Sequence, residues 1–466
     1  MPSSASRPPS SSDYDVLVFR GVRAIDPLSN LDAIVDVVVE GKVIKRVGPN
    51  AAVSLAGLAD LGGPGGQRVF DVPHAPRALL LPGLFDLHTH LREPGQEYKE
   101  DLESGLGAAA AGGFTDVCAM PNTRPVNDNR AITEMLSYKS RALGGTRLHP
   151  IAAITVGQKG EVLTEMADLK AGGAIAVSDD GYCVTRSDVM RRALEYASTF
   201  DLPVIQHCED HALTAGAQMH EGAMSTKLGL RGWPRVAEDI IVARDVILAE
   251  YTRAKYHVAH ISTLGAVRIL REAKSRGVPV TAEVTPHHLL LTDALLLGYN
   301  TACKVNPPLR EKGDLEALYE ALADGTIDCV ATDHAPHSSL EKDCDLTDAS
   351  PGMIGLELCV PLMLGLVHKG IVPLQRLVHA LTAAPAKIAG LPPSRIKEGA
   401  EANLTLVDPS AEWTVTADRL RSKSKNTPFL GQNVTGMVVM TIVSGVVAFD
   451  ASAKLGYEQS RQARPK

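Results

Sequence analysis

The sequence predicts an α/β protein, a (β/α)8 TIM-like barrel beside a small β-sandwich domain built from both chain termini. Two observations predict this fold. From about residue 79 onward, short apolar runs alternate with stretches of helical periodicity, as in parallel strands joined by helices. Before and after that segment, short runs rich in Val, Ile and Thr follow one another without helices between them, which is typical of antiparallel sheet.

The alternating segment contains the number of strands that a barrel needs. Helical stretches separate most of the strands, for example 131–143, 162–171, 189–199, 237–251, 266–276 and 314–323. The expected strands lie near 80–88, 114–120, 148–155, 174–179, 203–207, 256–261, 278–285 and 327–333. A doubly wound open sheet is the alternative, but no Gly-x-Gly-x-x-Gly sequence opens the first helix.

These patterns divide the chain into five segments. The Ser- and Pro-rich start predicts a disordered tail, and the polar end predicts a second tail. The expected segments are the tail 1–13, the N-terminal part of the β-sandwich domain 14–78, the (β/α)8 barrel domain 79–395, the C-terminal part of the β-sandwich domain 396–450 and the polar tail 451–466.

Composition favours a small-molecule substrate. The 47 Lys and Arg against 54 Asp and Glu give a net charge of −7 without long runs of one sign, so neither a nucleic-acid nor a membrane partner is expected. The most apolar long stretch, 353–367, is too short to span a bilayer. Residues 1–13 lack the apolar segment of a signal peptide, and the seven cysteines are odd in number and scattered. We therefore expect a cytoplasmic protein with reduced cysteines.

Two histidines one residue apart follow the first apolar run of the barrel. In a strand, side chains at i and i+2 share a face, so His88 and His90 should point together into the barrel mouth. Two converging imidazoles make half of a metal site. Taken alone, the pair could equally be two polar residues at a strand end.

More residues of metal-ligand type follow the later strands. Asp179-Asp180-Gly181 could by itself be a turn, and His207 and His260 could each be satisfied core histidines. Asp333 could simply end a strand and start a loop. Because active sites of such barrels lie at the carboxyl ends of the strands, their coincidence there predicts a metal centre. Four histidines and two or three carboxylates exceed what one tetrahedral Zn²⁺ needs and suit a pair of divalent ions.

Seven motifs along the chain resemble those of one enzyme family. The sequence is similar to dihydroorotases of the amidohydrolase superfamily, most closely the bacterial class I type, from about residue 15 to 450. The motifs are Asp86-Leu87-His88-Thr89-His90-Leu91-Arg92-Glu93-Pro94-Gly95, Met120-Pro121-Asn122-Thr123, Ser178-Asp179-Asp180-Gly181, His207-Cys208-Glu209-Asp210, Ala259-His260-Ile261-Ser262, Asn306-Pro307-Pro308-Leu309-Arg310 and Ala331-Thr332-Asp333-His334-Ala335-Pro336-His337.

This resemblance implies zinc-dependent, reversible hydrolysis of the cyclic amide of (S)-dihydroorotate to N-carbamoyl-L-aspartate in pyrimidine biosynthesis. It also implies roles for individual residues. His88, His90 and Asp180 would hold one of two zinc ions, His207 and His260 the other with Asp180 bridging, and Asp333 would act at the metal centre as the acid and base. Arg92, Asn122, Asn306 and His337, with His90, would bind the substrate, and the backbone at Pro351 and Gly352 would close the pocket. A homodimer is expected, and the resemblance also allows a complex with aspartate transcarbamoylase.

Two alternative functions stay open at this point. A related cyclic amidase, such as a hydantoinase, dihydropyrimidinase or allantoinase, uses a carbamylated lysine near the end of the fourth strand, but residues 174–180 contain no lysine. Arg92 suits a substrate carboxylate that hydantoins lack. An inactive dihydroorotase-like scaffold subunit of aspartate transcarbamoylase would be expected to lack metal ligands, and here every expected ligand is present.

The chain departs from the family pattern in a few places. It has Gly355-Leu356-Glu357-Leu358 where the family commonly has Gly-Leu-Glu-Thr, its loop 338–350 is idiosyncratic, and the tail 1–13 is extra. None of these touches an expected ligand, but they leave open how a loop closes over the substrate. His287 and His288 are further histidines, which we interpret as structural or as supporting the ligands.

Overall fold

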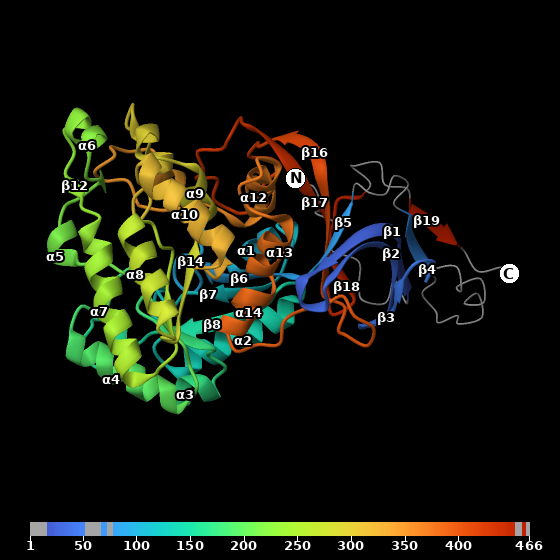
Figure 1. Ribbon diagram of the computed structural model, residues 1–466, viewed down its shortest axis with the longest axis horizontal. Coiled ribbons are helices and arrows are strands. Elements are labelled where there is room, and N and C mark those ends of the chain that lie inside the picture. The colour runs from blue at the N-terminus through green and yellow to red at the C-terminus, as the bar shows by residue number, and fades with distance from the viewer. Residues whose placement is uncertain (1–15, 52–66, 72–77, 453–458, 463–466) are drawn as a thin grey trace.

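The computed structural model describes residues 16–51, 67–71, 78–452 and 459–462. A barrel with its helices forms the larger part of the chain, and a sheet from both chain ends lies beside it (Figure 1). The predicted tail 1–13 lies outside the described residues. The predicted boundaries 14–78, 79–395 and 396–450 stay predictions, since only the elements themselves are seen.

Eight parallel strands form the barrel. Each strand pairs with its neighbour in the order β15-β14-β13-β10-β9-β8-β7-β6, and a parallel bridge from Thr89 to His334 joins the first strand to the chain just after the last. The predicted barrel is thus confirmed, and the doubly wound alternative is wrong. The strands are β6 (Leu84–Thr89), β7 (Phe114–Ala119), β8 (Arg147–Ala152), β9 (Ala176–Ser178), β10 (Val204–Gln206), β13 (Tyr256–Val258), β14 (Val280–Val284) and β15 (Cys329–Val330).

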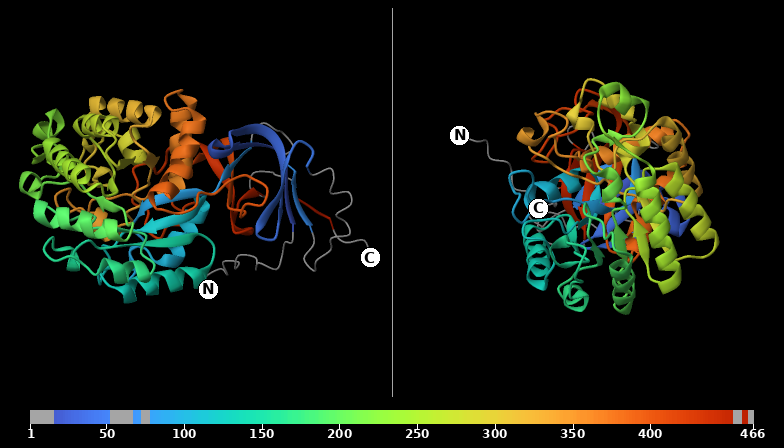
Figure 2. Two further views of the ribbon diagram at one scale, coloured as in Figure 1. Left: turned by 60° about the horizontal axis from the view of Figure 1, so that its bottom comes forward. Right: turned by 90° about the vertical axis from the view of Figure 1, so that its left-hand side faces the viewer.

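Helices lie around the outside of the strands (Figure 2). Between consecutive strands lie α1 (Leu102–Ala111), α2 (Arg130–Leu143), α3 (Met166–Ala171), α4 (Ser187–Thr199), α7 (Val236–Thr252), α8 (Leu264–Ser275) and α10 (Lys312–Asp324), and after the last strand come α12 (Cys359–His368), α13 (Leu374–Leu381) and α14 (Ala383–Ile388). The loops carry α5 (His211–Thr214), α6 (Ala223–Leu228), α9 (Pro286–Leu290), α11 (Ser339–Lys342) and the paired short strands β11 (Met219–His220) and β12 (Gly232–Trp233).

The predicted first strand, 80–88, is in fact two strands in two different sheets. Strand β5 (Leu79–Pro82) pairs with β1 and β16 of the terminal sheet, whereas β6 begins the barrel. The break falls at Gly83, where a Cβ would lie 2.3 Å from Thr115 Oγ1. A side chain does not fit there, so glycine lets the chain pass closely from one sheet to the other. The predicted helix 162–171 also begins later, at Met166, because Leu163 forms a bridge with Thr155.

The second sheet is built from both chain ends, as predicted. Strand β16 from the C-terminal part lies between β5 and β17, and β1 pairs with β2 on the other side of β5. Its strands are β1 (Val16–Asp26), β2 (Leu31–Glu40), β3 (Val43–Gly48), β4 (Gln67–Asp71), β5, β16 (Leu404–Thr414), β17 (Asn433–Val443), β18 (Val446–Asp450) and β19 (Gln459–Gln462). Strand β19 lies within the predicted loose tail 451–466 and pairs with β4, so that prediction does not hold at 459–462.

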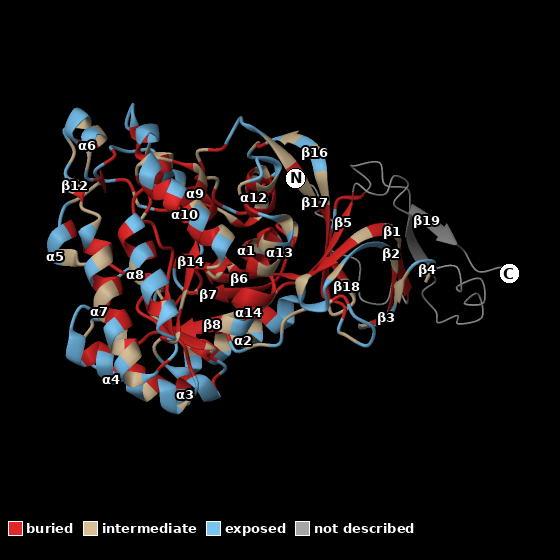
Figure 3. Cartoon of the chain, in the orientation of Figure 1, coloured by how far each residue is buried: buried red, intermediate tan, exposed pale blue. Residues whose placement is uncertain are grey.

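Burial follows the layers of the fold. The barrel strands are buried, while helices such as α4 and α7 expose their outer faces (Figure 3). None of the seven cysteines is paired in a disulfide and six are buried, so the predicted core positions are confirmed for six of them, and their reduced state stays a prediction. Within the described ranges, no helix is both long and apolar enough to cross a bilayer.

Candidate metal centre

Polar side chains gather at the carboxyl ends of the barrel strands. His88 lies near the end of β6 and His90 just beyond it, and Asp180 follows β9. His207 and His260 follow β10 and β13, and Asp333 follows β15. All six side chains are buried. The structure therefore brings together, at one end of one barrel, every residue that the sequence analysis expected as a metal ligand.

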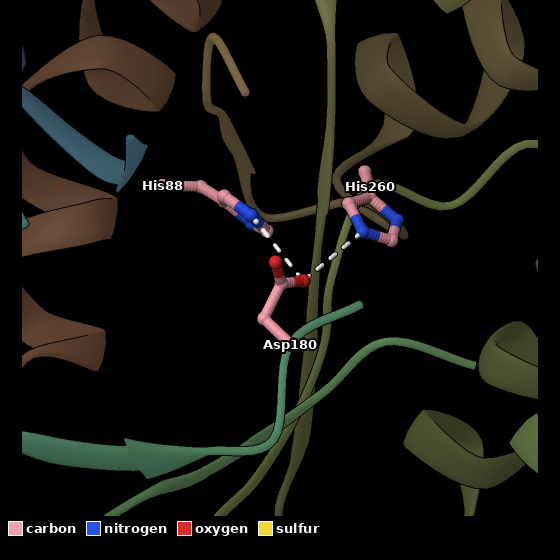
Figure 4. A group of neighbouring side chains, drawn as sticks. All are labelled: His88, Asp180 and His260. Carbon is pink, nitrogen blue, oxygen red and sulfur yellow. Dashed lines mark ion pairs between the residues drawn. The ribbon is translucent and has the colours of Figure 1, made fainter. Parts of the chain in front are cut away.

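The Asp180 carboxylate lies at the middle of the four histidines. Its Oδ1 is 3.5 Å from both His88 Nε2 and His260 Nε2 (Figure 4). The other oxygen, Oδ2, is 3.4 Å from His90 Nε2, and His207 Nδ1 lies 4.0 Å from Oδ1. One carboxylate thus faces ring nitrogens on both sides, as a bridging group would.

Asp333 approaches the same centre from the last strand. Its Oδ1 lies 3.1 Å from His90 Nε2 and 3.7 Å from His88 Nε2. Burial raises the pKa of Asp333, but the hydrogen bond with His90 and the charge of His88 outweigh it and hold the pKa below its usual range. The side chain is therefore a carboxylate near neutral pH.

The donor atoms at this centre fit a metal ion. His88 Nε2 and Asp180 Oδ1 are buried and have no hydrogen-bond partner among the described residues, which is costly unless another group satisfies them. The sets His88, Asp180, His260 and His88, His90, Asp333 each offer three ligand atoms within 4.8 Å of one another. Imidazole nitrogens and carboxylate oxygens are the ligands that Zn²⁺ takes in hydrolases.

Three of the histidines are held from behind by an acceptor on their other ring nitrogen. His90 Nδ1 lies 2.9 Å from Asn122 Oδ1, and His207 Nε2 lies 2.9 Å from Glu209 Oε2. His88 Nδ1 lies 2.7 Å from Glu283 Oε1. Such contacts fix the orientation of a ligand ring. Sequence reasoning assigned no role to Glu209 or Glu283. The signal that could have indicated Glu283 is its charge, which is unusual inside the apolar strand near 278–285.

The backbone is strained at three positions where the chain leaves a barrel strand at this centre. Arg92, His260 and Asp333 have φ angles of 63°, 29° and 45°, a region that residues other than glycine rarely adopt. Each lies where a strand has just ended and the chain turns over the barrel mouth. Strain of this kind persists where the surroundings hold it, and it clusters at functional sites.

The residues expected to bind the substrate lie beside the centre. Arg92 Nε donates to Pro336 O at 3.1 Å, and Arg92 Nη2 lies 3.2 Å from His337 Nε2. His337 Nε2 is also 2.9 Å from Pro351 O. Burial lowers the pKa of Arg92 to about 10, which still leaves the guanidinium charged at neutral pH. Burial and the nearby Arg92 lower the pKa of His337 to about 2, so this imidazole is neutral.

The backbone next to His337 needs a glycine. Gly352 has a φ of 138°, and a Cβ there would lie 2.7 Å from Ala335 Cβ and 3.0 Å from His337 Nε2. Asn426 Nδ2 donates to Gly352 O at 3.1 Å and to Ala335 O at 3.0 Å. This segment is therefore held close against His337 by a residue from the C-terminal part of the chain.

The two predicted asparagines also lie against the ligands. Asn122 Nδ2 donates to Asp180 Oδ2 at 3.4 Å, in addition to the contact of its Oδ1 with His90. Asn306 Nδ2 donates to Glu209 Oε2 at 3.3 Å, while its Oδ1 is buried with no partner among the described residues. An unused buried acceptor beside the centre is consistent with a ligand-binding role for Asn306.

The two histidines set aside in the sequence differ from each other. His288 is within hydrogen-bond distance of Thr285 Oγ1 and Pro307 O, which fits a structural role. His287 has a buried Nε2 without a partner in the described part of the chain, and burial lowers its pKa to about 4. Neither belongs to a group of converging ligand atoms among the described residues.

The idiosyncratic loop 338–350 is tied down by a buried lysine. Lys342 Nζ donates to Ser350 O at 2.8 Å and to Lys304 O at 3.3 Å. Lys304 Nζ in turn donates to Leu346 O at 2.6 Å. The loop is thus anchored next to Pro351 by Lys342, which donates to the backbone carbonyls of Ser350 and Lys304, and by Lys304, which donates to a backbone carbonyl of the loop.

A parallel barrel with buried histidines and carboxylates at its mouth defines the class of metal-dependent barrel hydrolases. Comparison with known proteins narrows this class. Residues 77–265 match the family described as dihydro-orotase-like. The chain is 49% identical over 433 residues to a dihydroorotase of Geobacter metallireducens, covering 93% of this chain and 99% of that protein. It is 49% identical over 438 residues to a dihydroorotase of Anaeromyxobacter dehalogenans, covering 94% and 98%. The chain belongs to the dihydroorotase family.

Solved structures agree on the fold. An L-hydantoinase (dihydropyrimidinase) from Arthrobacter aurescens superposes with a TM-score of 0.80 at 23% identity, over 93% of this chain and 96% of that one. A dihydropyrimidinase from Brevibacillus agri superposes with a TM-score of 0.76 at 22% identity, over 93% and 95%. These structures share the fold of this chain and do not decide its substrate.

Proposed function

We propose that this protein is a dihydroorotase that reversibly hydrolyses the cyclic amide of (S)-dihydroorotate to N-carbamoyl-L-aspartate in pyrimidine biosynthesis. One observation carries this proposal. A buried, charged Arg92 lies two residues from the ligand pair His88 and His90, so a carboxylate-bearing substrate can be held next to the metal centre. The likeness to dihydroorotases over most of the chain supports the same activity.

We also propose that the centre holds two zinc ions bridged by Asp180. Each proposed pair of histidines, His88 with His90 and His207 with His260, has ring nitrogens facing the Asp180 carboxylate. His207 presents its Nδ1, 3.0 Å from His260 Nε2, on the side away from Glu209. Bound zinc would polarise the amide carbonyl and lower the pKa of a water molecule at the site.

The chain's own residues would then move one proton. Asp333 would accept a proton from the attacking water as its oxygen adds to the amide carbon. When the C–N bond breaks, Asp333 would return that proton to the departing ring nitrogen, so the carboxylate is regenerated. Arg92 would hold the substrate carboxylate throughout, which keeps the amide carbon near Asp333.

A direct assay tests the proposed substrate. The purified protein is offered dihydroorotate, hydantoin, dihydrouracil and allantoin side by side, with its zinc content measured on the same sample. We expect kcat/KM to be highest for dihydroorotate. A higher value for any of the other three compounds would instead make the protein a related cyclic amidase, and no turnover of any by zinc-loaded protein would favour the scaffold alternative.

Replacing Arg92 with alanine should weaken substrate binding. The change removes a charge-assisted contact worth about 1.5 to 3 kcal/mol, so kcat/KM should fall about 10- to 150-fold, mainly through KM. Zinc content should stay at the wild-type value. The matched control is Arg147→Ala, because Arg147 pairs with Asp116 near the amino ends of the strands. Normal substrate binding with loss of zinc would show that Arg92 supports the metal instead.

We further propose that the protein forms a homodimer through α7. This helix buries one face yet also exposes Val236, Ile240, Ile247 and Tyr251, by 49%, 49%, 63% and 70%. The four positions are symmetric about the middle of the helix, so two antiparallel copies would place Ile240 of one against Ile247 of the other. A self-complementary apolar stripe is what a two-fold interface needs.

Replacing Ile247 with glutamate should therefore weaken the dimer. A charge buried at the centre of the contact should cost about 2 kcal/mol or more, about 30-fold in the dimer dissociation constant. Light scattering across a dilution series measures this constant. Tyr138→Glu is the control, because Tyr138 is 72% exposed on α2. An unchanged dimer in the Ile247 variant would place the interface elsewhere, and a monomeric wild type would refute the dimer.

Two further points concern location and partners. We propose a cytoplasmic location, supported by seven free cysteines, as expected in a reducing compartment. An association with aspartate transcarbamoylase stays a prediction from family resemblance.

A further inference from the structure

A fully buried carboxylate lies behind the metal centre on a strand that supplies none of the expected ligands. Glu283 is on β14, and its side chain is completely inaccessible to solvent. Burying a carboxylate without partners is costly, so its contacts indicate why it is there. Those contacts lead directly to His88.

Both oxygens of Glu283 are occupied. Oε1 lies 2.7 Å from His88 Nδ1 and also accepts from the backbone N–H of His260 at 3.4 Å. Oε2 lies 3.2 Å from His257 Nε2, and His257 Nδ1 lies 2.8 Å from Thr281 Oγ1. A buried series of hydrogen bonds therefore runs from Thr281 through His257 and Glu283 to His88.

This series of hydrogen bonds selects one tautomer of the His88 ring. Oε1 of Glu283 already accepts from the backbone N–H of His260, and both of its oxygens lie against ring nitrogens, so the Glu283 side chain acts as an acceptor toward both histidines. His88 must then carry a proton on Nδ1, so Nε2 is the ring nitrogen that can offer its lone pair to a metal ion. Nε2 is the atom that faces Asp180 and Asp333 without a hydrogen-bond partner of its own among the described residues.

The same contact also fixes the direction of the ring. Rotating the His88 ring by half a turn would put the carbon Cδ2 in place of Nδ1 and break the 2.7 Å contact with Glu283. In that orientation a ring carbon would face the carboxylate, which is unfavourable at a fully buried site. Glu283 thus holds both the proton and the ring orientation that a metal ligand requires.

We propose that Glu283 is a positioning residue that sets the tautomer and orientation of His88, and through them the affinity of the centre for the metal ion that His88 binds. This inference rests on the metal centre proposed above. It assigns Glu283 no contact with substrate and no proton transfer, because its oxygens are already used by His88, His257 and His260.

Glu283→Gln tests this role with almost no change of volume. His257 Nε2–H needs an acceptor, so the amide oxygen of the new side chain should face His257 and its NH₂ group should face His88. That arrangement drives the His88 proton onto Nε2, the atom that must bind metal. Competition against a chromogenic chelator should show that one of the two zinc equivalents binds about 10- to 100-fold more weakly.

Asp116→Asn is the matched control. Asp116 is another buried carboxylate in contact with a histidine, His149, at 2.8 Å, but it lies on β7 near the amino ends of the strands. Its loss should leave both zinc affinities within about threefold of the wild type, because Asp116 contacts no expected ligand. The melting temperature of each metal-free variant reports folding separately, and the rise in melting temperature on adding zinc should shrink only for Glu283→Gln.

The outcomes distinguish a failure of the proposed metal centre from a failure of the proposed role of Glu283. If the wild type binds no zinc, the proposed centre is wrong. If the wild type binds two zinc ions and Glu283→Gln binds both as tightly, only the role of Glu283 is overturned. Should Glu283→Gln fail to fold, Glu283→Asp keeps the charge but draws it away from His88, and it should still lower one zinc affinity by about threefold to tenfold; unchanged affinity there would overturn the proposal equally.

Discussion

Asp333→Asn is expected to lower both directions of the reaction by about 10² to 10⁴ while leaving zinc bound. Asparagine has the shape of aspartate, and its amide oxygen can still lie near His90, 3.1 Å from Oδ1 in the present structure. It cannot accept and return a proton. Rates of hydrolysis and of ring closure, measured on protein of confirmed zinc content, check this expectation.

The pH dependence of the wild type should follow from the same role. Hydrolysis needs Asp333 as a base, and because its pKa lies below the usual range the base form is present at neutral pH. Hydrolysis should therefore fall as pH falls through that low pKa, whereas ring closure, which needs the protonated form, should rise as pH falls. Asp333→Asn should lose these opposite slopes. If the rates of Asp333→Asn lie within about tenfold of the wild-type rates for hydrolysis or for ring closure, another group moves the proton.

Much of the site could be predicted from sequence because its ligands follow simple geometric rules. His88 and His90 are two residues apart on a strand, so they share a face, and Asp180, His207 and His260 each follow a strand of one parallel barrel. The carboxyl ends of parallel strands meet at one end of the barrel. Local pattern and topology together therefore bring these side chains to one point, as the distances around Asp180 show.

The features that sequence reasoning missed depend on contacts between distant segments. The break at Gly83 exists because Thr115, on the neighbouring strand, leaves no room for a side chain. Glu283 matters because it meets His88, 195 residues away, and no local pattern reports such a pair. The strained backbone at Asp333 and the strand β19 also come from the surrounding packing and pairing, which the local residue types do not encode.

Removing the metal should abolish activity, and zinc alone should restore it without bicarbonate. The metals would supply several kcal/mol of stabilisation to the charge that develops on the amide oxygen, so the metal-free protein should retain less than about a thousandth of the activity. The group proposed to bridge them is the unmodified carboxylate of Asp180. Residues 174–180 contain no lysine that carbon dioxide could carbamylate.

The experiment compares the chelated protein after adding zinc with and without bicarbonate. We expect the same recovery of activity with and without bicarbonate, because Asp180 is ionised. Burial raises the pKa of Asp180, but the contacts with His88 and His260 outweigh it and hold the pKa well below the usual range. The Asp180 carboxylate can therefore bind zinc without first losing a proton. Recovery that requires bicarbonate, or a mass increase of the zinc-loaded protein by one carbon dioxide, would show that a lysine elsewhere in the chain bridges the ions instead.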